Sequence, residues 1–147
     1  MRLTSYTDYA LRTLMYCGLR RDGLATISEI AEAYGISRNH VVKIVHDLGR
    51  LGLLDTRRGK GGGIRLGRPP AEIRLGRLVA LLEGARPLVE CFDPHACHCP
   101  IVGVCRLQDV LAEAQQAFYD ALDRYTLADL LESAVGLRER LGLSAAV

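Results

Sequence analysis

The stretch from residue 24 to residue 66 limits the possible folds more than any other part of the chain. Apolar residues recur there at helical spacing in two short segments that meet at Gly35, a residue type that commonly ends a helix. Ser37 stands where the second segment needs an N-cap. Two runs with strand character follow, 53–56 and 63–66, joined by a basic, glycine-rich loop. This order predicts a helix-turn-helix followed by a β-hairpin wing.

Helical patterns on both sides of this stretch complete the expected fold. Aromatic residues make up 5% of the chain and tryptophan is absent, so the core must consist mainly of Leu, Val, Ile and Ala, which favours helices. Further helices are predicted over 5–20 (with Ser5 as N-cap and Asp8 three residues later), over about 73–82 and 105–125, and after Thr126. We therefore expect a mainly α-helical protein. Its predicted parts are a winged helix-turn-helix domain over 1–84, a loop over 85–104, and a long helix with a C-terminal helix over 105–147.

The charges divide unevenly along the chain. Residues 1–78 hold 14 Lys and Arg against 7 Asp and Glu, whereas residues 79–147 hold 5 against 10. A basic first half suggests that this part meets a polyanion, although two ordinarily solvated surfaces would give the same counts.

The predicted recognition helix and wing carry side chains suited to DNA. Arg38, Asn39 and Lys43 point outward in the helical pattern and match the edges of guanine and adenine in the major groove. The glycines of the wing allow close approach to the duplex, and its basic residues suit phosphates or the minor groove. A nucleotide-binding loop is excluded because no strand–GxxxxGK[ST]–helix order is present. The predicted DNA-binding residues are Ser28, Ser37, Arg38, Asn39, His40, Lys43, Arg57, Arg58 and Lys60.

Four of the five cysteines fall within fifteen positions. No signal peptide or run of eighteen apolar residues is present, so we expect a cytoplasmic protein, where clustered cysteines favour metal binding over disulfides. Their spacing matches neither the paired motifs of zinc ribbons nor those of bacterial ferredoxins, so an iron–sulfur cluster and a structural zinc both remain possible. An enzyme with a reactive cysteine is not supported, since no accompanying base or oxyanion site is evident. The four residues are Cys91, Cys97, Cys99 and Cys105; Cys17 is expected to pack in the core.

Three of these segments together resemble one protein family. Residues 7–12, the basic wing over 57–63, and the spacing of Cys91, Cys99 and Cys105 are similar to the Rrf2 superfamily of winged-helix regulators, above all to its nitric-oxide-sensing repressors. The resemblance covers about residues 2–135.

The resemblance implies a homodimer joined by the long helix, with an iron–sulfur cluster near the interface. The cluster is expected to be 4Fe–4S rather than 2Fe–2S, held by Cys91, Cys99 and Cys105 of one subunit and by Asp8 of the partner subunit. Asp8 could instead cap its own helix. Cys97 is one thiol more than the family pattern needs; it could be a ligand in place of Cys99 or Asp8, and His98 is a weaker alternative.

The function implied is that of a DNA-binding repressor that senses nitric oxide through its cluster and controls nitric oxide detoxification genes. Two alternatives stay open: a regulator that senses cluster supply or redox state, and a winged-helix protein with a structural zinc.

Overall fold

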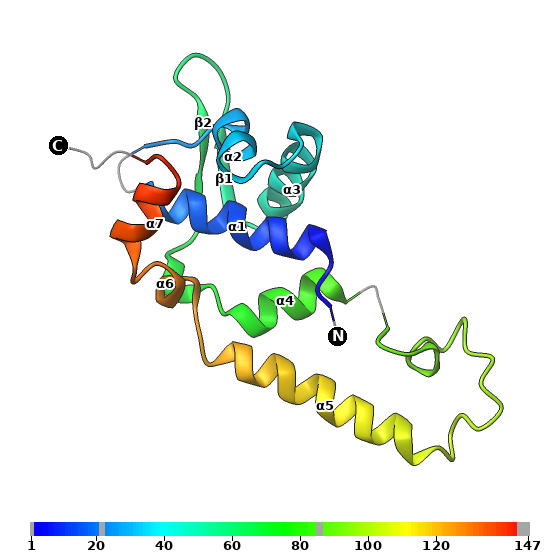
Figure 1. Cartoon of the computed structure of the whole chain (residues 1–147). Coiled ribbons are helices and arrows are strands. Elements are labelled where there is room, and N and C mark those ends of the chain that lie inside the picture. The colour runs from blue at the N-terminus through cyan, green and yellow to red at the C-terminus, as the bar shows by residue number, and fades with distance from the viewer. Residues whose placement is uncertain (1, 21–22, 85–86, 144–147) are drawn as a thin grey trace. The chain divides into compact units, whose positions relative to one another are not determined.

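The structure, a computed structural model, describes residues 2–20, 23–84 and 87–143 (Figure 1). None of the described helices is long and apolar enough to span a membrane. In chain order the elements are α1 (Ser5–Leu19), α2 (Ile27–Tyr34), α3 (Arg38–Arg50), β1 (Leu54–Arg57), β2 (Gly63–Leu66), the 3₁₀ turn η1 (Pro70–Glu72), α4 (Leu75–Glu83), the 3₁₀ turn η2 (Glu90–Phe92), α5 (Arg106–Asp123), α6 (Leu127–Leu130) and α7 (Ala134–Arg140).

Helix caps in the first half follow the sequence closely, with one exception. Ser37 accepts a hydrogen bond from the His40 amide at 3.3 Å, and Gly35 ends α2 at φ 62°. The prediction of Ser5 as the cap of α1 was wrong. Thr4 has the extended backbone of a cap, and its hydroxyl accepts from the Thr7 amide at 3.1 Å, so Ser5 is the first helical residue.

The hairpin presents one face to the core and the other to solvent. Strands β1 and β2 are antiparallel, with Leu54 opposite Leu66 and Asp55 opposite Arg65. Leu54 and Ile64 are buried, so the face that carries Asp55 and Arg65 points to solvent. Ala25 extends the sheet, because it exchanges two backbone hydrogen bonds with Ile64 at 2.8 and 2.7 Å.

Chain contacts separate two units, each compact. The first consists of Thr4–Ile73 and Thr126–Val147, and the second of Arg74–Tyr125 with Met1–Leu3. This grouping differs from the predicted domains: α4 belongs with α5, and the C-terminal helices belong with the winged helix.

The return of the C-terminal helices rests on specific contacts. Leu127 is fully buried and its amide donates to the Ile73 carbonyl at 2.9 Å. The Arg138 guanidinium donates two hydrogen bonds to the Leu19 carbonyl, at 2.7 and 3.0 Å. These bonds attach α6 and α7 to the unit that contains α1, and they join residues up to 119 positions apart.

Helices α4 and α5 approach each other closely at Gly76. A Cβ atom at this position would lie 2.6 Å from the Asp123 backbone nitrogen and would also meet the Tyr119 carbonyl oxygen. Asp123 accepts a hydrogen bond from the Arg77 amide at 3.0 Å, which holds the end of α5 against the first turn of α4. Only glycine fits between these two backbones.

Gly76→Ala should therefore destabilise the protein by about 1–3 kcal/mol, because the added methyl group forces α4 and α5 apart. Urea unfolding followed by circular dichroism would measure the loss. Gly136→Ala is the matched control, since it lies in helix α7 with nothing within 4 Å of the added atom. The control should be neutral or slightly stabilising; equal stability of the two variants would contradict the close-approach argument.

Candidate DNA interface and cysteine loop

The predicted base-contacting residues gather at the exposed start of α3. Val41, Ile44 and Leu48 face the core of the first unit, which fixes the opposite face of α3 toward solvent. On that opposite face and at the cap lie Ser37, Arg38, Asn39, His40 and Lys43, all exposed. Ser28 is also exposed, in the first turn of α2.

The wing is a glycine-rich turn with three exposed basic residues. Gly59 and Gly61 adopt positive φ angles of 95° and 78°, which side chains strongly disfavour, so this turn needs glycine at both positions. Arg57, Arg58 and Lys60 stand between and before them, fully accessible. The α3 helix and the wing belong to the same compact unit, so all nine predicted DNA-binding residues lie in that unit.

Two tyrosines of α1 contact α3, and sequence reasoning missed both. The Tyr6 hydroxyl donates to Asp47 at 2.7 Å, while the Lys43 ammonium lies 5.8 Å from the centre of the Tyr6 ring. The Tyr9 ring lies 6.1 Å from the His40 ring. The hydrogen bond from Tyr6 lowers the pKa of Asp47, with His46 and Lys43 adding to the effect. These contacts fix the orientation of α3 from the side that faces α1.

Wing and helix variants should separate general from specific DNA binding. Arg58→Ala should weaken binding to every sequence and lower the log–log salt slope by about 0.9, because one phosphate contact is lost. Asn39→Ala should reduce base discrimination by about 1–3 kcal/mol. Fluorescence anisotropy over a salt series, with two duplexes of different sequence, measures both. Arg140→Ala on exposed α7 is the control; a wing variant that behaved like this control would remove the wing from the interface.

The cysteine loop is anchored to α5 at both ends. Cys105 is the N-cap residue of α5, and the Gln108 side chain donates to the Cys91 carbonyl oxygen at 3.3 Å. All four loop thiols are partly accessible, whereas Cys17 is buried. Burial raises the pKa of Cys17 to about 12, which leaves it an inert packing residue at neutral pH.

The donor chemistry of the loop fits a thiophilic metal centre. The pKa of Cys91 is raised, first by loss of solvation and then by the charges of Cys97, Cys99 and Cys105. Within the described residues, no three His, Cys, Asp or Glu side chains converge tightly enough to hold a metal ion. The structure therefore shows the donors close along one loop but does not assemble them into a coordination sphere. His95 and His98 are exposed, and the His98 ring lies 2.9 Å from the Ala96 carbonyl.

Asp8 lies in α1, in the other unit from the cysteines, and its carboxylate is paired. Arg12 contacts both oxygens, with Nε at 3.0 Å from Oδ1 and Nη2 at 2.8 Å from Oδ2. The alternative prediction, that Asp8 caps α1, was wrong because Thr4 occupies that role. Both side chains of the pair are more than two-fifths exposed, so the pair contributes only about 0–1 kcal/mol.

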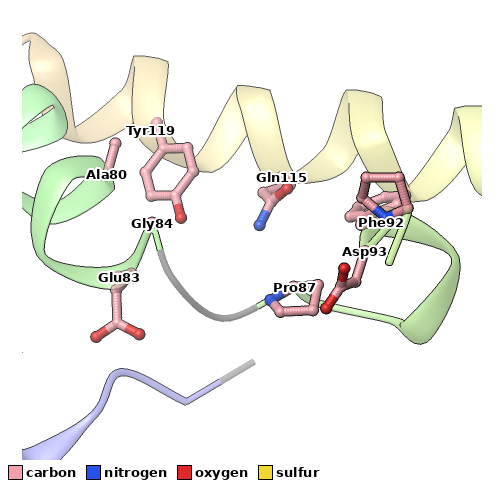
Figure 2. A pocket seen from close by; sticks show the side chains of 9 residues that line it. Ala80, Glu83, Gly84, Pro87, Phe92, Asp93, Gln115 and Tyr119 are labelled. Carbon is pink, nitrogen blue, oxygen red and sulfur yellow. The ribbon is translucent and has the colours of Figure 1, made fainter. Parts of the chain in front are cut away.

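A pocket of about 410 Å³ lies beside the loop within the second unit (Figure 2). Pro87, Phe92 and Asp93 of the loop lie along one side of it, and Gln115 and Tyr119 of α5 face them. Since Phe92 follows Cys91 directly, the loop residue next to the first cysteine is part of this wall.

Known proteins give the same picture of the whole chain. The Rrf2 family profile, described as iron-dependent transcriptional regulator, matches residues 3–133. This chain belongs to the Rrf2 family. The HTH-type transcriptional regulator NsrR of Geobacillus kaustophilus is 49% identical over 142 residues, covering 96% of this chain and 97% of that protein. NsrR of Bacillus subtilis is 48% identical over 134 residues, covering 90% and 92%.

Solved Rrf2-type structures confirm the predicted winged-helix fold. Staphylococcus aureus CymR in its oxidized form aligns with a TM-score of 0.70 at 26% identity, over 90% of this chain and 97% of that one. IscR of T. potens aligns with a TM-score of 0.73 at 23% identity, over 91% and 88%, which shows the shared fold. The predicted family and fold class are therefore confirmed, and the chain is a DNA-binding transcriptional regulator rather than an enzyme.

Proposed function

We propose that this regulator is a homodimeric repressor whose operator binding depends on an iron–sulfur cluster, and that it responds to nitric oxide and controls nitric oxide detoxification genes. The observation that carries the proposal is the loop of four accessible thiols at the start of α5, in a chain 49% identical to an NsrR over nearly its whole length. Accessible thiols in such density suit a metal centre exposed to a small diffusible ligand.

Cys91, Cys99 and Cys105 would hold the cluster, a 4Fe–4S type in preference to 2Fe–2S, with Asp8 of the partner subunit as the fourth ligand. Cys105 is the N-cap residue of α5 and so lies at the positive end of the helix dipole. Gln108 fixes the backbone of Cys91, so the first and last ligands are both tied to the same helix. When bound, the cluster supplies iron with which nitric oxide reacts.

The long helix supports the dimer. In the single chain α5 has no buried residue, and the apolar side chains of Leu107 and Val110 are 62% and 50% exposed. A helix with an apolar stripe left in water needs a partner. A second α5 would cover this stripe.

Asp8 would couple the cluster to the predicted DNA-binding residues, because it belongs to α1, which packs against α3. Its neighbours Tyr6 and Tyr9 contact Asp47 and His40 of α3, so a displacement of α1 moves the recognition helix. Breaking the ion pair between Asp8 and Arg12 costs little free energy, because both side chains are exposed. Two recognition helices must keep a fixed spacing to reach both operator half-sites, and that spacing is what the release of Asp8 would disturb.

Protein purified without oxygen should be coloured and contain iron together with acid-labile sulfide, since thiolate-to-iron charge transfer absorbs visible light and zinc thiolate does not. Nitric oxide should bleach or shift this spectrum. Alanine in place of Cys91, Cys99 or Cys105 should remove the colour, whereas Cys97→Ala should retain it. Loss of colour in Cys97→Ala together with its retention in Cys99→Ala would reverse the assignment of the middle ligand, and a colourless protein with one zinc per chain would refute the cluster.

Asp8→Ala and Arg12→Gln each remove one partner of the same ion pair, the first its carboxylate and the second its guanidinium. Each should change stability by less than about 1 kcal/mol. Only Asp8→Ala should alter the cluster spectrum and make the cluster more labile, because only it removes a ligand oxygen. Visible circular dichroism and thermal unfolding of both variants provide the comparison.

Mixing subunits tests whether the ligand crosses the dimer. A heterodimer of Asp8→Ala and Cys99→Ala subunits should keep one complete site and about half the colour of the native dimer. An unaltered spectrum in the Asp8→Ala homodimer would leave Cys97, His95 and His98 as the remaining fourth-ligand candidates.

A further inference from the structure

A second basic feature lies beside the wing and shares only Arg57 with the residues predicted to contact DNA. A cleft of about 670 Å³ opens between the end of α1, the connection to α2 and the solvent face of the hairpin. It lies wholly within the first unit, so its walls belong to one rigid scaffold. The described residues that line it are Arg20, Gly23, Leu24, Asp55, Thr56, Arg57 and Arg65.

The charges of the cleft are only partly compensated. Arg20 is paired with Glu29, and Arg65 lies 3.4 Å from Asp55 in an exposed pair. Arg57 faces the same side of β1 as Asp55, two positions on, and no described carboxylate forms an ion pair with it. Because the Arg65–Asp55 pair is long and solvated, Arg65 can exchange its carboxylate for another anion at little cost.

Arg20 adds a donor that lacks a partner. Its Nε–H is buried and forms no hydrogen bond with any of the described residues. Because this nitrogen is buried it does not face the cleft, and the guanidinium is held by Glu29 and lies 5.8 Å from the centre of the Tyr16 ring, so Arg20 contributes mainly its positive charge.

The shape and lining indicate what kind of anion would bind. The cleft is far larger than one phosphate group, and no aromatic side chain lines it among the described residues, so it offers nothing for a nucleobase to stack on. Three arginines with Leu24 as the one large apolar residue among the described lining residues suit a sugar–phosphate backbone or a free phosphate, which guanidinium groups bind with two parallel hydrogen bonds.

We propose that this cleft, centred on Arg65, Arg57 and Arg20, binds a phosphate group, and that the group belongs to the DNA backbone outside the wing. The proposal rests on DNA binding by the regulator but on neither the cluster nor its signal. We assign the phosphate to DNA because the cleft lies next to the wing loop, and Arg57 belongs to both. The cleft would extend the footprint of each subunit along the duplex without reading sequence.

The test uses the full-length protein and a mixed-sequence duplex long enough to span two half-sites, so that operator identity does not enter. Arg65→Gln should weaken binding about tenfold and lower the log–log salt slope by about 0.9, as expected for one lost phosphate contact. Asp55→Asn should strengthen binding, because it frees Arg65. Arg140→Gln and Glu139→Gln, exposed neighbours on α7, are the matched controls for loss of one positive or one negative charge.

Weaker DNA binding by Arg65→Gln and stronger DNA binding by Asp55→Asn, each change larger than that of its control, would support the proposal. A structural defect would instead weaken binding in both variants. Thermal unfolding should be unchanged in both variants, since the pair they break is exposed. A second arm titrates inorganic phosphate into DNA-free protein and follows the Arg65 and Arg57 side-chain signals by NMR.

The two arms distinguish the source of the phosphate. Reduced DNA affinity in Arg65→Gln assigns the cleft to the DNA backbone. Unchanged DNA affinity together with saturable phosphate binding that Arg65→Gln abolishes assigns it to a free phosphorylated ligand. If Arg65→Gln matches Arg140→Gln on DNA and inorganic phosphate does not saturate, the cleft is not an anion site. That result would leave the predicted recognition helix and wing untouched.

Discussion

Helices α1 and α3 pack against each other through side chains that are almost wholly removed from water, and the placement of the DNA-binding residues depends on this packing. Leu14, Ile44 and Leu48 are at most 1% exposed. Each such side chain contributes about 1.5–3 kcal/mol on burial, so α3 has one favourable orientation on α1. The contacts of Tyr6 and Tyr9 then fix the rotation of α3 on α1, because they join the two helices at Asp47 and His40, outside the fully buried side chains. Whatever moves α1 must therefore move the residues that meet base edges.

The cysteine loop follows a different principle, since little apolar burial holds it. Its two ends are fastened to α5, by the cap at Cys105 and by the Gln108 hydrogen bond, while the segment between them forms short turns with accessible thiols. The loop and the winged helix belong to separate compact units, so the loop is not part of the core that holds the predicted DNA-binding residues.

Local features of this chain were predictable from sequence, and non-local ones were not. The hairpin, the cap at Ser37 and the end of α2 at Gly35 depend on residues within a few positions of one another, so their patterns identified them. The cap of α1 was placed one residue too late, because Thr4 and Ser5 are both good cap residues and only the backbone conformation chooses between them. Tyr6 and Asp47 are 41 positions apart and carry no periodic signal that would link them. The return of α7 to α1 was missed for the same reason. The cysteine spacing identified the donors, but which of them bind depends on three-dimensional convergence that spacing alone does not contain.

The unit that contains the winged helix is discontinuous in the chain, because Arg138 donates to the Leu19 carbonyl and Leu127 is buried. A ribosome therefore finishes α4, the cysteine loop and α5 before it supplies the segments that close the winged helix. During synthesis, the cysteine loop is therefore complete while the winged-helix unit still lacks α6 and α7. The unit that carries the predicted DNA-binding residues becomes complete only when α6 and α7 have been made and Leu127 and Arg138 reach their partners.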